Sequence, residues 1–313
     1  MTIGIGVMCE YGDCAILASD MRVTYGTMPI DPHDRAGKQF SFPPFNFGAT
    51  MAGSTSSVHA IVSEFASQLK ILLLAYVQAK EKNPKVKIQF EHIRNALEFS
   101  RKKELRRLQA CAMDSELGLS LEDWLVGKLP TGQPFNRYAH AEGLRVLKNV
   151  KDNMQYNAGI IVAGFLREDA IFMRGLGASP VEEFASPANY VVGGKGAVEA
   201  LKVLVNRKQN VEMGVARSLL HVYEALNAAK LDKAVGEPSS YVVIRPHTKR
   251  RPNGMQRIFP EHHLLEQWSK KYKLTETDAL EAPFANQLID AALSPDRSKR
   301  NQWLGPKELM LEL

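Results

Sequence analysis

The order of strand-like and helix-like segments predicts an α+β protein, a four-layer αββα sandwich with a helical insertion and a C-terminal extension. Two observations carry this prediction. Strand patterns occur in runs, and helix patterns occur in pairs between those runs. A chain of strands, two helices, strands, two helices and one strand does not fit a doubly wound parallel sheet. The expected strands are residues 3–10, 13–20, 38–42, 47–53, 160–165, 170–173, 190–192 and 241–244.

The first twenty residues predict a β-hairpin that has a hydroxyl residue directly behind the initiator methionine. Two apolar runs flank a turn at residues 11–13, and the second run ends on Asp20. If Met1 is removed, Thr2 carries a hydroxyl nucleophile and a free amine that can act as its base. An α-amino group has a pKa of about 7.7–8.0, close to working pH. Thr2 is also a common second residue, so its position alone does not decide between these interpretations.

Two helices are expected after the strand at 47–53. Apolar residues between 58 and 76 recur at i, i+3, i+4 and i+7, which predicts a core helix with one apolar stripe. Its most apolar stretch, residues 71–74, lies between Lys70 and Lys80 and is expected to be too short to span a bilayer. A second helix should begin near Phe90.

The predicted boundaries are a main domain at 1–245, with an insertion at about 100–155, and an extension at 246–313. The insertion combines basic helical stretches with a Pro-Thr-Gly turn signal. Residues 193–196 break a short strand and open a helix, and a second helix follows at about 215–226. The extension is polar and basic, with a helix expected near His263–Tyr272.

Composition indicates an ordinary globular protein, because 45% of its residues are hydrophobic and 24% are charged. Three cysteines form no CxxC pair, and we expect a reducing, cytoplasmic location without a secretory signal. The net charge of +6 permits an acidic partner. The basic residues occur in short runs typical of solvated faces, so we expect no nucleic-acid partner and no membrane partner.

Within this order of elements, four short motifs resemble the β subunits of the proteasome and bacterial HslV, the N-terminal-nucleophile (Ntn) hydrolases. Thr2 stands where that family has its processed threonine, and Ala18-Ser19-Asp20-Met21-Arg22 matches the family's acidic segment. Gly37-Lys38 matches the entry to the next strand, and Ala52-Gly53-Ser54 precedes the first long helix. The resemblance covers about residues 2–95 and 156–245.

The resemblance implies a role for each matched residue. Thr2 is the nucleophile, Lys38 favours its alkoxide, and Asp20 holds Lys38 charged and oriented. The backbone N–H of Gly53 stabilises the oxyanion at a helix N-terminus. Met51, two residues before this glycine, falls where the family shapes the S1 substrate pocket, with packing in the core as the alternative.

Two later positions depart from the family pattern. Lys195 stands between Gly194 and Gly196 where a serine normally contacts the threonine amine. Asp232 matches a family acid, but Val235 replaces the serine that follows it. A second lysine lowers the amine pKa further or blocks the site, and both outcomes remain open.

The expected function is that of a threonine-type endopeptidase without cofactor or metal. The resemblance implies self-assembly into stacked hexameric or heptameric rings, an AAA+ unfoldase as a possible partner, and peptides or unfolded proteins as substrates. Two alternatives stay open: an amidase that acts on a small substrate without a ring, and a catalytically inactive structural ring subunit.

Overall fold

The computed structural model describes residues 3–20, 23–25, 28–30, 38–42, 45–128, 132–134, 137–167, 169–177, 179–183, 189–232, 235–236, 239–246 and 255–258. Thr2, most of the predicted extension and its expected helix near His263–Tyr272 lie outside these residues. The chain divides into two compact units. The first comprises Met1–Gly53, Ile160–Arg174 and Glu183–Leu313, and the second comprises Ser54–Gly159 and Gly175–Glu182.

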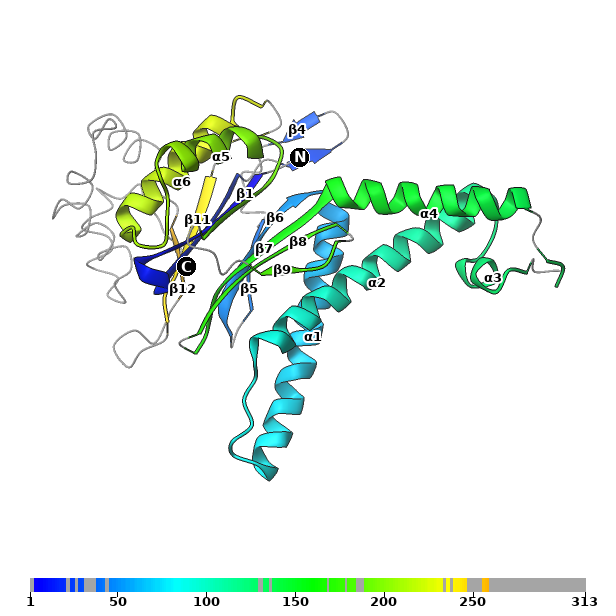
Figure 1. The fold of residues 1–313 in the computed structure, drawn as a ribbon, viewed down its shortest axis with the longest axis horizontal. Coiled ribbons are helices and arrows are strands. Elements are labelled where there is room, and N and C mark those ends of the chain that lie inside the picture. The colour runs from blue at the N-terminus through cyan, green and yellow to red at the C-terminus, as the bar shows by residue number, and fades with distance from the viewer. Residues whose placement is uncertain are drawn as a thin grey trace. The chain divides into compact units, whose positions relative to one another are not determined.

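Two antiparallel sheets confirm the predicted α+β class (Figure 1). The first sheet has the strand order β10-β1-β2-β11-β12. Its strands are β1 (Ile3–Cys9), β2 (Cys14–Asp20), β10 (Tyr190–Gly194), β11 (Ser239–Ile244) and β12 (Met255–Ile258). The second sheet has the order β5-β6-β7-β8-β9. Its strands are β5 (Gln39–Ser41), β6 (Asn46–Gly53), β7 (Ala158–Leu166), β8 (Asp169–Leu176) and β9 (Glu182–Glu183).

The predicted N-terminal hairpin is confirmed with slightly shorter strands. A 3₁₀ turn, η1 (Glu10–Gly12), joins β1 to β2. A separate small hairpin consists of β3 (Val23–Tyr25) and β4 (Met28–Ile30). Part of the predicted extension is strand, because β12 pairs with β11 at the edge of the first sheet.

Strand β1 is buried on both faces, which explains its alternation of branched and small residues. Ile3, Ile5 and Val7 pack in one apolar cluster with residues of α5 (Ala197–Asn206) and α6 (Val215–Ala229). The intervening glycines face the second sheet. A Cβ on Gly6 would lie 2.7 Å from Cγ2 of Ile161, so the two sheets approach more closely there than any side chain permits.

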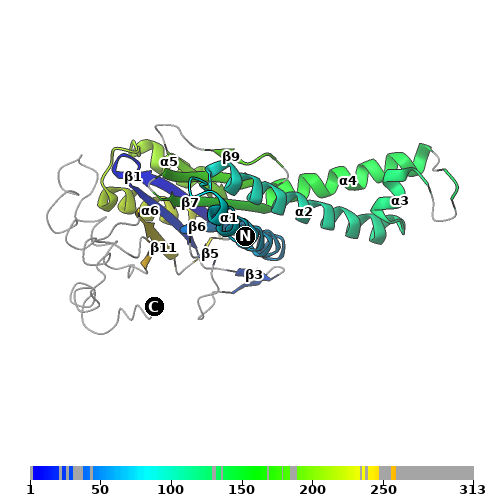
Figure 2. The ribbon, with the colours of Figure 1, turned by 90° about the horizontal axis from the view of Figure 1, so that it is seen from below.

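The second unit contains four helices, two of them long. They are α1 (Thr55–Lys82), α2 (Phe90–Leu117), α3 (Leu121–Val126) and α4 (Arg137–Asn157). Helix α2 begins at the predicted Phe90 and runs unbroken through residue 100, where the insertion was expected to start. Helices α2 and α4 lie side by side, with α3 at their far end (Figure 2).

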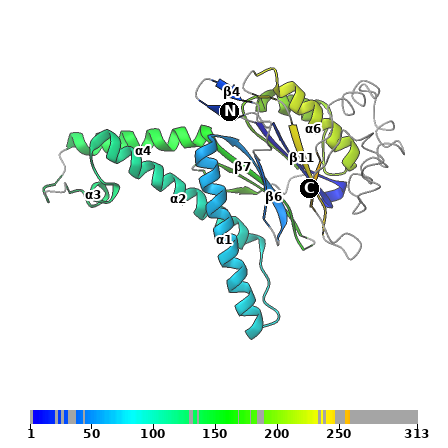
Figure 3. The same ribbon diagram turned by 180° about the vertical axis from the view of Figure 1, so that it is seen from behind.

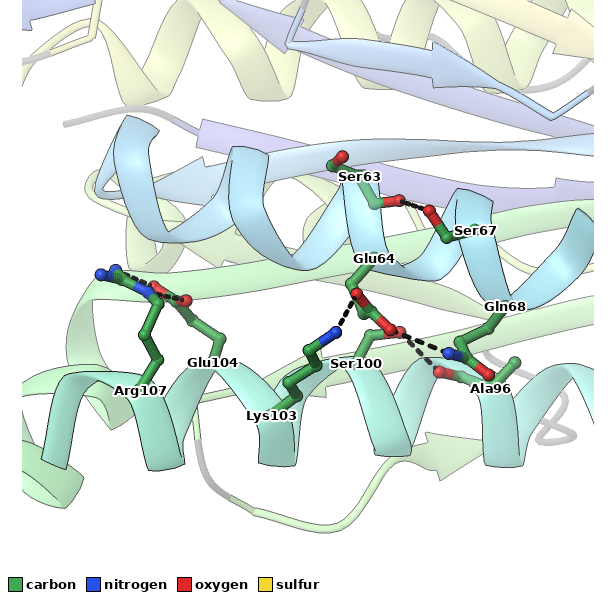
Figure 4. Close-up of polar contacts among 9 residues, drawn as sticks. All are labelled: Ser63, Glu64, Ser67, Gln68, Ala96, Ser100, Lys103, Glu104 and Arg107. Carbon is green, nitrogen blue, oxygen red and sulfur yellow. Dashed lines mark hydrogen bonds and ion pairs between the residues drawn. The ribbon is translucent and has the colours of Figure 1, made fainter. Parts of the chain in front are cut away.

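Polar and apolar contacts hold this unit together. The Glu64 carboxylate of α1 accepts hydrogen bonds from Lys103 Nζ of α2 at 2.7 Å and from Gln68 Nε2 at 2.8 Å (Figure 4). The buried guanidinium of Arg101 donates to the backbone oxygens of Leu176, Gly177 and Ser179. A further small core forms where α2, α3 and α4 meet. It contains Met113, Leu119, Leu121, Trp124 and Val146.

Helix α1 departs from the sequence prediction in its second half. Val58, Ile61, Val62, Phe65 and Leu69 are buried, but the apolar residues after Leu69 are half-buried or exposed. The segment Ser56–Lys82 is long and apolar enough to cross a membrane by length and composition alone, with a mean hydropathy of 1.5 over its most apolar 18 residues. The argument that this region is too short to span a bilayer is therefore wrong.

Candidate active site

Asp20 collects three hydrogen bonds at the end of β2, within the first unit. Its Oδ1 accepts from the backbone N–H of Ile3 at 3.0 Å. Its Oδ2 accepts from Lys38 Nζ at 3.2 Å and from the backbone N–H of Gly236 at 3.3 Å. The side chain is completely buried. One carboxylate thereby connects the start of β1, the lysine that precedes β5 and the loop before β11.

Burial and hydrogen bonding act on the Asp20 carboxyl in opposite directions. Removal from water raises its pKa above the ordinary 3.8, and this is the largest effect. The positive charge of Lys38 and the hydrogen bonds from Ile3, Lys38 and Gly236 lower the pKa and offset part of the rise. The three donors therefore favour the ionised carboxylate, which burial disfavours.

Lys38 reaches Asp20 from the second sheet. It is 1% exposed, and its backbone oxygen accepts a hydrogen bond from the Met51 N–H at 3.0 Å. The next residue, Gln39, donates from Nε2 to the backbone oxygens of Leu17 at 3.2 Å and Ser240 at 2.9 Å. These bonds tie the start of β5 to the first sheet, so the Lys38 stem has little freedom.

Gly53 ends β6 with a φ of +113°, a backbone conformation that a residue with a side chain rarely adopts. Glycine is thus required here for the backbone path into α1, whatever the role of its N–H. Its predicted function in oxyanion binding stays a prediction. Met51, two residues earlier, is 4% exposed, and its predicted contribution to a substrate pocket also stays a prediction.

The strand register brings Lys195 to the same end of the first sheet as Asp20. Ile3 pairs with Gly194 of β10, and Lys195 is the next residue after that pair. On the other side, Asp20 pairs with Ser239 of β11. Lys195 is exposed in the turn that opens α5.

Asp232 is half-buried. It precedes Gly236, the residue whose N–H binds Asp20. The Asp232 backbone oxygen accepts a hydrogen bond from the Val235 N–H at 2.9 Å. Val235 is 3% exposed and packs in the apolar cluster of β1, α5 and α6. The next residue, Gly236, donates its N–H to Asp20.

Sequence reasoning missed some polar groups at this end of the sandwich. The amides of Ile3 and Gly236 bind Asp20, although only the Lys38 contact was expected. Within the described residues, the hydroxyls of Ser19 and Thr50 are buried and make no hydrogen bond. Backbone donors carry no sequence signal of their own, which explains the omission.

Comparison with known proteins supports the fold and corrects the family assignment. No protein-family model matches the sequence, and no curated protein matches it. A similar solved structure is the Gly-1 mutant of Anbu from Hyphomicrobium sp. strain MC1. It is 12% identical, with a TM-score of 0.54, over 87% of this chain and 94% of that chain. Structural similarity at this level shows a shared fold, which agrees with the predicted αββα sandwich.

The assignment to the proteasome β-subunit and HslV family was wrong. The similarity found is to Anbu, and it extends to the fold alone. The matched motifs around Asp20, Lys38 and Gly53 are only a few residues long. Proteins that share a fold can share the geometry of such short segments without belonging to one family.

Proposed function

We propose that this protein is an Ntn hydrolase of amide bonds, a threonine-type endopeptidase that uses Thr2 once Met1 has been removed. The observation that carries the proposal is the buried Asp20 carboxylate, which binds both Lys38 Nζ and the Ile3 N–H. Ile3 directly follows Thr2 in the chain. A buried lysine held at the start of β1 is the arrangement that activation of an adjacent hydroxyl requires.

The proposed reaction proceeds through an acyl-enzyme. The Thr2 Oγ attacks the carbonyl carbon of the substrate while the Thr2 amine accepts the hydroxyl proton. The positive charge of Lys38 stabilises the developing alkoxide, and the Gly53 N–H donates to the oxyanion. The amine then returns the proton to the leaving nitrogen as the C–N bond breaks. Water hydrolyses the resulting ester and regenerates the Thr2 hydroxyl.

Asp20 and Lys195 have supporting roles in this proposal. Asp20 keeps Lys38 charged and oriented through their contact at 3.2 Å. Lys195 follows the residue that pairs with Ile3, so its backbone lies at the end of β1 that leads to Thr2, within reach of its flexible side chain. A positive charge near an amine lowers the pKa of that amine, which keeps more of it in the neutral form that can accept a proton.

The test is an intact-mass measurement followed by labelling with a peptide epoxyketone. We expect a mass that lacks Met1 and a covalent adduct on Thr2. Thr2→Ala should abolish the adduct, whereas Thr2→Ser should retain it. A protein that keeps Met1 contradicts the proposal, because the amine is then one residue away from the hydroxyl.

A catalytically inactive ring subunit is the second candidate, favoured by the position of Lys195 beyond the Ile3–Gly194 pair. A free Thr2 N-terminus without epoxyketone labelling would support this alternative. We also propose self-assembly of the chain into closed rings. Light scattering during size-exclusion chromatography tests that part separately, because a monomeric mass contradicts assembly but leaves the chemistry of Thr2 intact.

A further inference from the structure

The second half of α1 presents an exposed apolar face. Leu69 is the last buried residue of this helix, and beyond it Ile71, Leu74 and Val77 are 57%, 56% and 50% exposed. These three residues follow one another at intervals of three, so they lie along one side of the helix. We call them the distal face of α1. Three large aliphatic side chains in one stripe cost solvation free energy unless a partner covers them.

The course of the backbone agrees with this exposure. The second half of α1 and the returning segment 83–89 project away from α2 (Figures 1 and 3). Only 22% of the most apolar 18-residue window in Ser56–Lys82 is buried. Apolar side chains that a core helix would bury are exposed to solvent here.

The charge around the distal face is predominantly positive. Residues 70–89 contain five exposed lysines and a single acid, Glu81, which gives a net charge of +4 from 5 − 1. The lysines are Lys70, Lys80, Lys82, Lys85 and Lys87. Four of them gather in the eight residues at the end of the helix and the start of the turn. Such a cluster beside apolar side chains is complementary to a surface that is apolar beneath and negatively charged above.

We propose that the distal face of α1 docks this protein on the surface of an anionic lipid membrane. Ile71, Leu74 and Val77 enter the boundary between headgroups and acyl chains, as the apolar side of an interfacial helix does. The lysine stems extend along the apolar layer and place their ammonium groups among the phosphates. Each lysine near an anionic surface raises affinity about fivefold. This proposal departs from the expectation of no membrane partner and does not depend on the activity of Thr2.

The charge argues against a second copy of the chain as the occupant. Pairing two distal faces would bring two sets of five lysines together, with only one Glu81 in each to compensate. Like charges in close contact oppose such an interface. The first half of α1 argues against a membrane-spanning helix, because Val58 and Phe65 are completely buried in the folded chain. Insertion of the whole helix would remove those side chains from the core.

Vesicle flotation of the full chain tests the proposal. The probes are phosphatidylcholine vesicles alone and vesicles with about one-third phosphatidylglycerol. We expect binding only to the anionic vesicles, with release at about 1 M salt, where the Debye length falls to about 3 Å. The combined substitution Ile71→Ser, Leu74→Ser and Val77→Ser should weaken binding at least tenfold. Replacing the four lysines between 80 and 87 by glutamine should do the same.

Matched controls change equally exposed residues elsewhere. Leu201→Ser with Val205→Ser removes apolar surface from α5, and Lys148→Gln with Lys151→Gln removes charge from α4. Both should bind as the parent protein does, and circular dichroism should show all variants folded. Failure to bind anionic vesicles, or an equal loss in the controls, overturns the proposal. A lower solution mass for the distal-face variant than for the parent also overturns the proposal, because it would show that a second copy covers the face in the parent.

Discussion

Replacement of His221 should remove part of this protein's sensitivity to acid. His221 lies on α6 and is 4% exposed, with Nδ1 at 2.8 Å from Oε1 of Gln209. Because Gln209 donates from Nε2 to Ser218 Oγ and the Asn210 oxygen, its Oε1 is the acceptor that faces the ring. The network therefore assigns the proton of the neutral imidazole to Nδ1.

The magnitude follows from the pKa of the imidazole. Burial, together with the positive charges of Arg207 and Arg217, lowers the pKa of His221 from 6.5 to about 3, and burial is the largest of these effects. The unfolded chain binds the proton below pH 6.5, whereas the folded chain does so only near pH 3. The neutral His221 therefore makes its full contribution to the stability of the fold above pH 6.5, and this contribution is lost as the pH falls toward 3. Between pH 7 and pH 4.5 the loss is about 2.5 kcal/mol, at about 1.36 kcal/mol for each pH unit.

The assay is urea unfolding at pH 7 and pH 4.5 for the parent protein and for His221→Asn. The Asn amide nitrogen can replace Nδ1 as the donor to Gln209 but cannot be protonated. The smaller side chain lowers stability equally at both pH values, so only the difference between them is compared. On acidification from pH 7 to pH 4.5, the free energy of unfolding of His221→Asn should fall by about 2.5 kcal/mol less than that of the parent. His59→Asn, at an exposed position of α1, is the matched control and should behave as the parent does.

An equal loss of stability in the parent and in His221→Asn would refute the reasoning. That result would mean that the imidazole takes up its proton within the folded state, through exposure or through an acidic partner. Direct titration of the His221 ring by nuclear magnetic resonance should show no protonation above pH 4.5.

Four further substitutions test the site and the core. Asp20→Asn should slow epoxyketone labelling at least tenfold, because about 1.4 kcal/mol of lost charge stabilisation through Lys38 is already tenfold in rate. Lys195→Ser should move the rising limb of the pH profile of labelling upward by about one unit, since a nearby cation lowers the amine pKa; an unchanged limb contradicts that role. Gly53→Ala should lower stability by about 1–3 kcal/mol in urea unfolding, because alanine is strained at a φ of +113°. Gly6→Ala should lower it by about 1–3 kcal/mol through contact with the second sheet, and a neutral result would mean that the sheets separate freely.

One contact of the candidate site was expected from the sequence. The resemblance implied that Asp20 holds Lys38, and their side chains form an ion pair at 3.2 Å. The amide of Gly236 could not be predicted, since it approaches Asp20 across 216 residues of chain. Contacts between a side chain and a distant backbone depend on how elements pack, which no local pattern encodes.

Helix α1 shows most clearly that apolar periodicity does not determine burial. The spacing correctly predicted a long helix with an apolar stripe, because side chains at i, i+3 and i+4 share a face in any α-helix. It also predicted a core position along the whole length, and that was wrong after Leu69. Periodicity establishes which residues lie on one side of a helix, whereas the neighbouring elements decide whether that side is covered.

By itself, the sequence determined the types and order of most elements and the hydroxyl residue behind Met1. The elements follow from backbone preferences and from periodicity over a few residues, whereas Asp20, Lys38 and Gly53 became candidates through short motifs. Only the tertiary structure decided that Asp20 binds three donors from separate segments, that Val235 packs in the core, and that α1 extends beyond its buried half. Each of these depends on which distant surfaces meet, and removal from water changes both the charge state and the exposure of the groups involved.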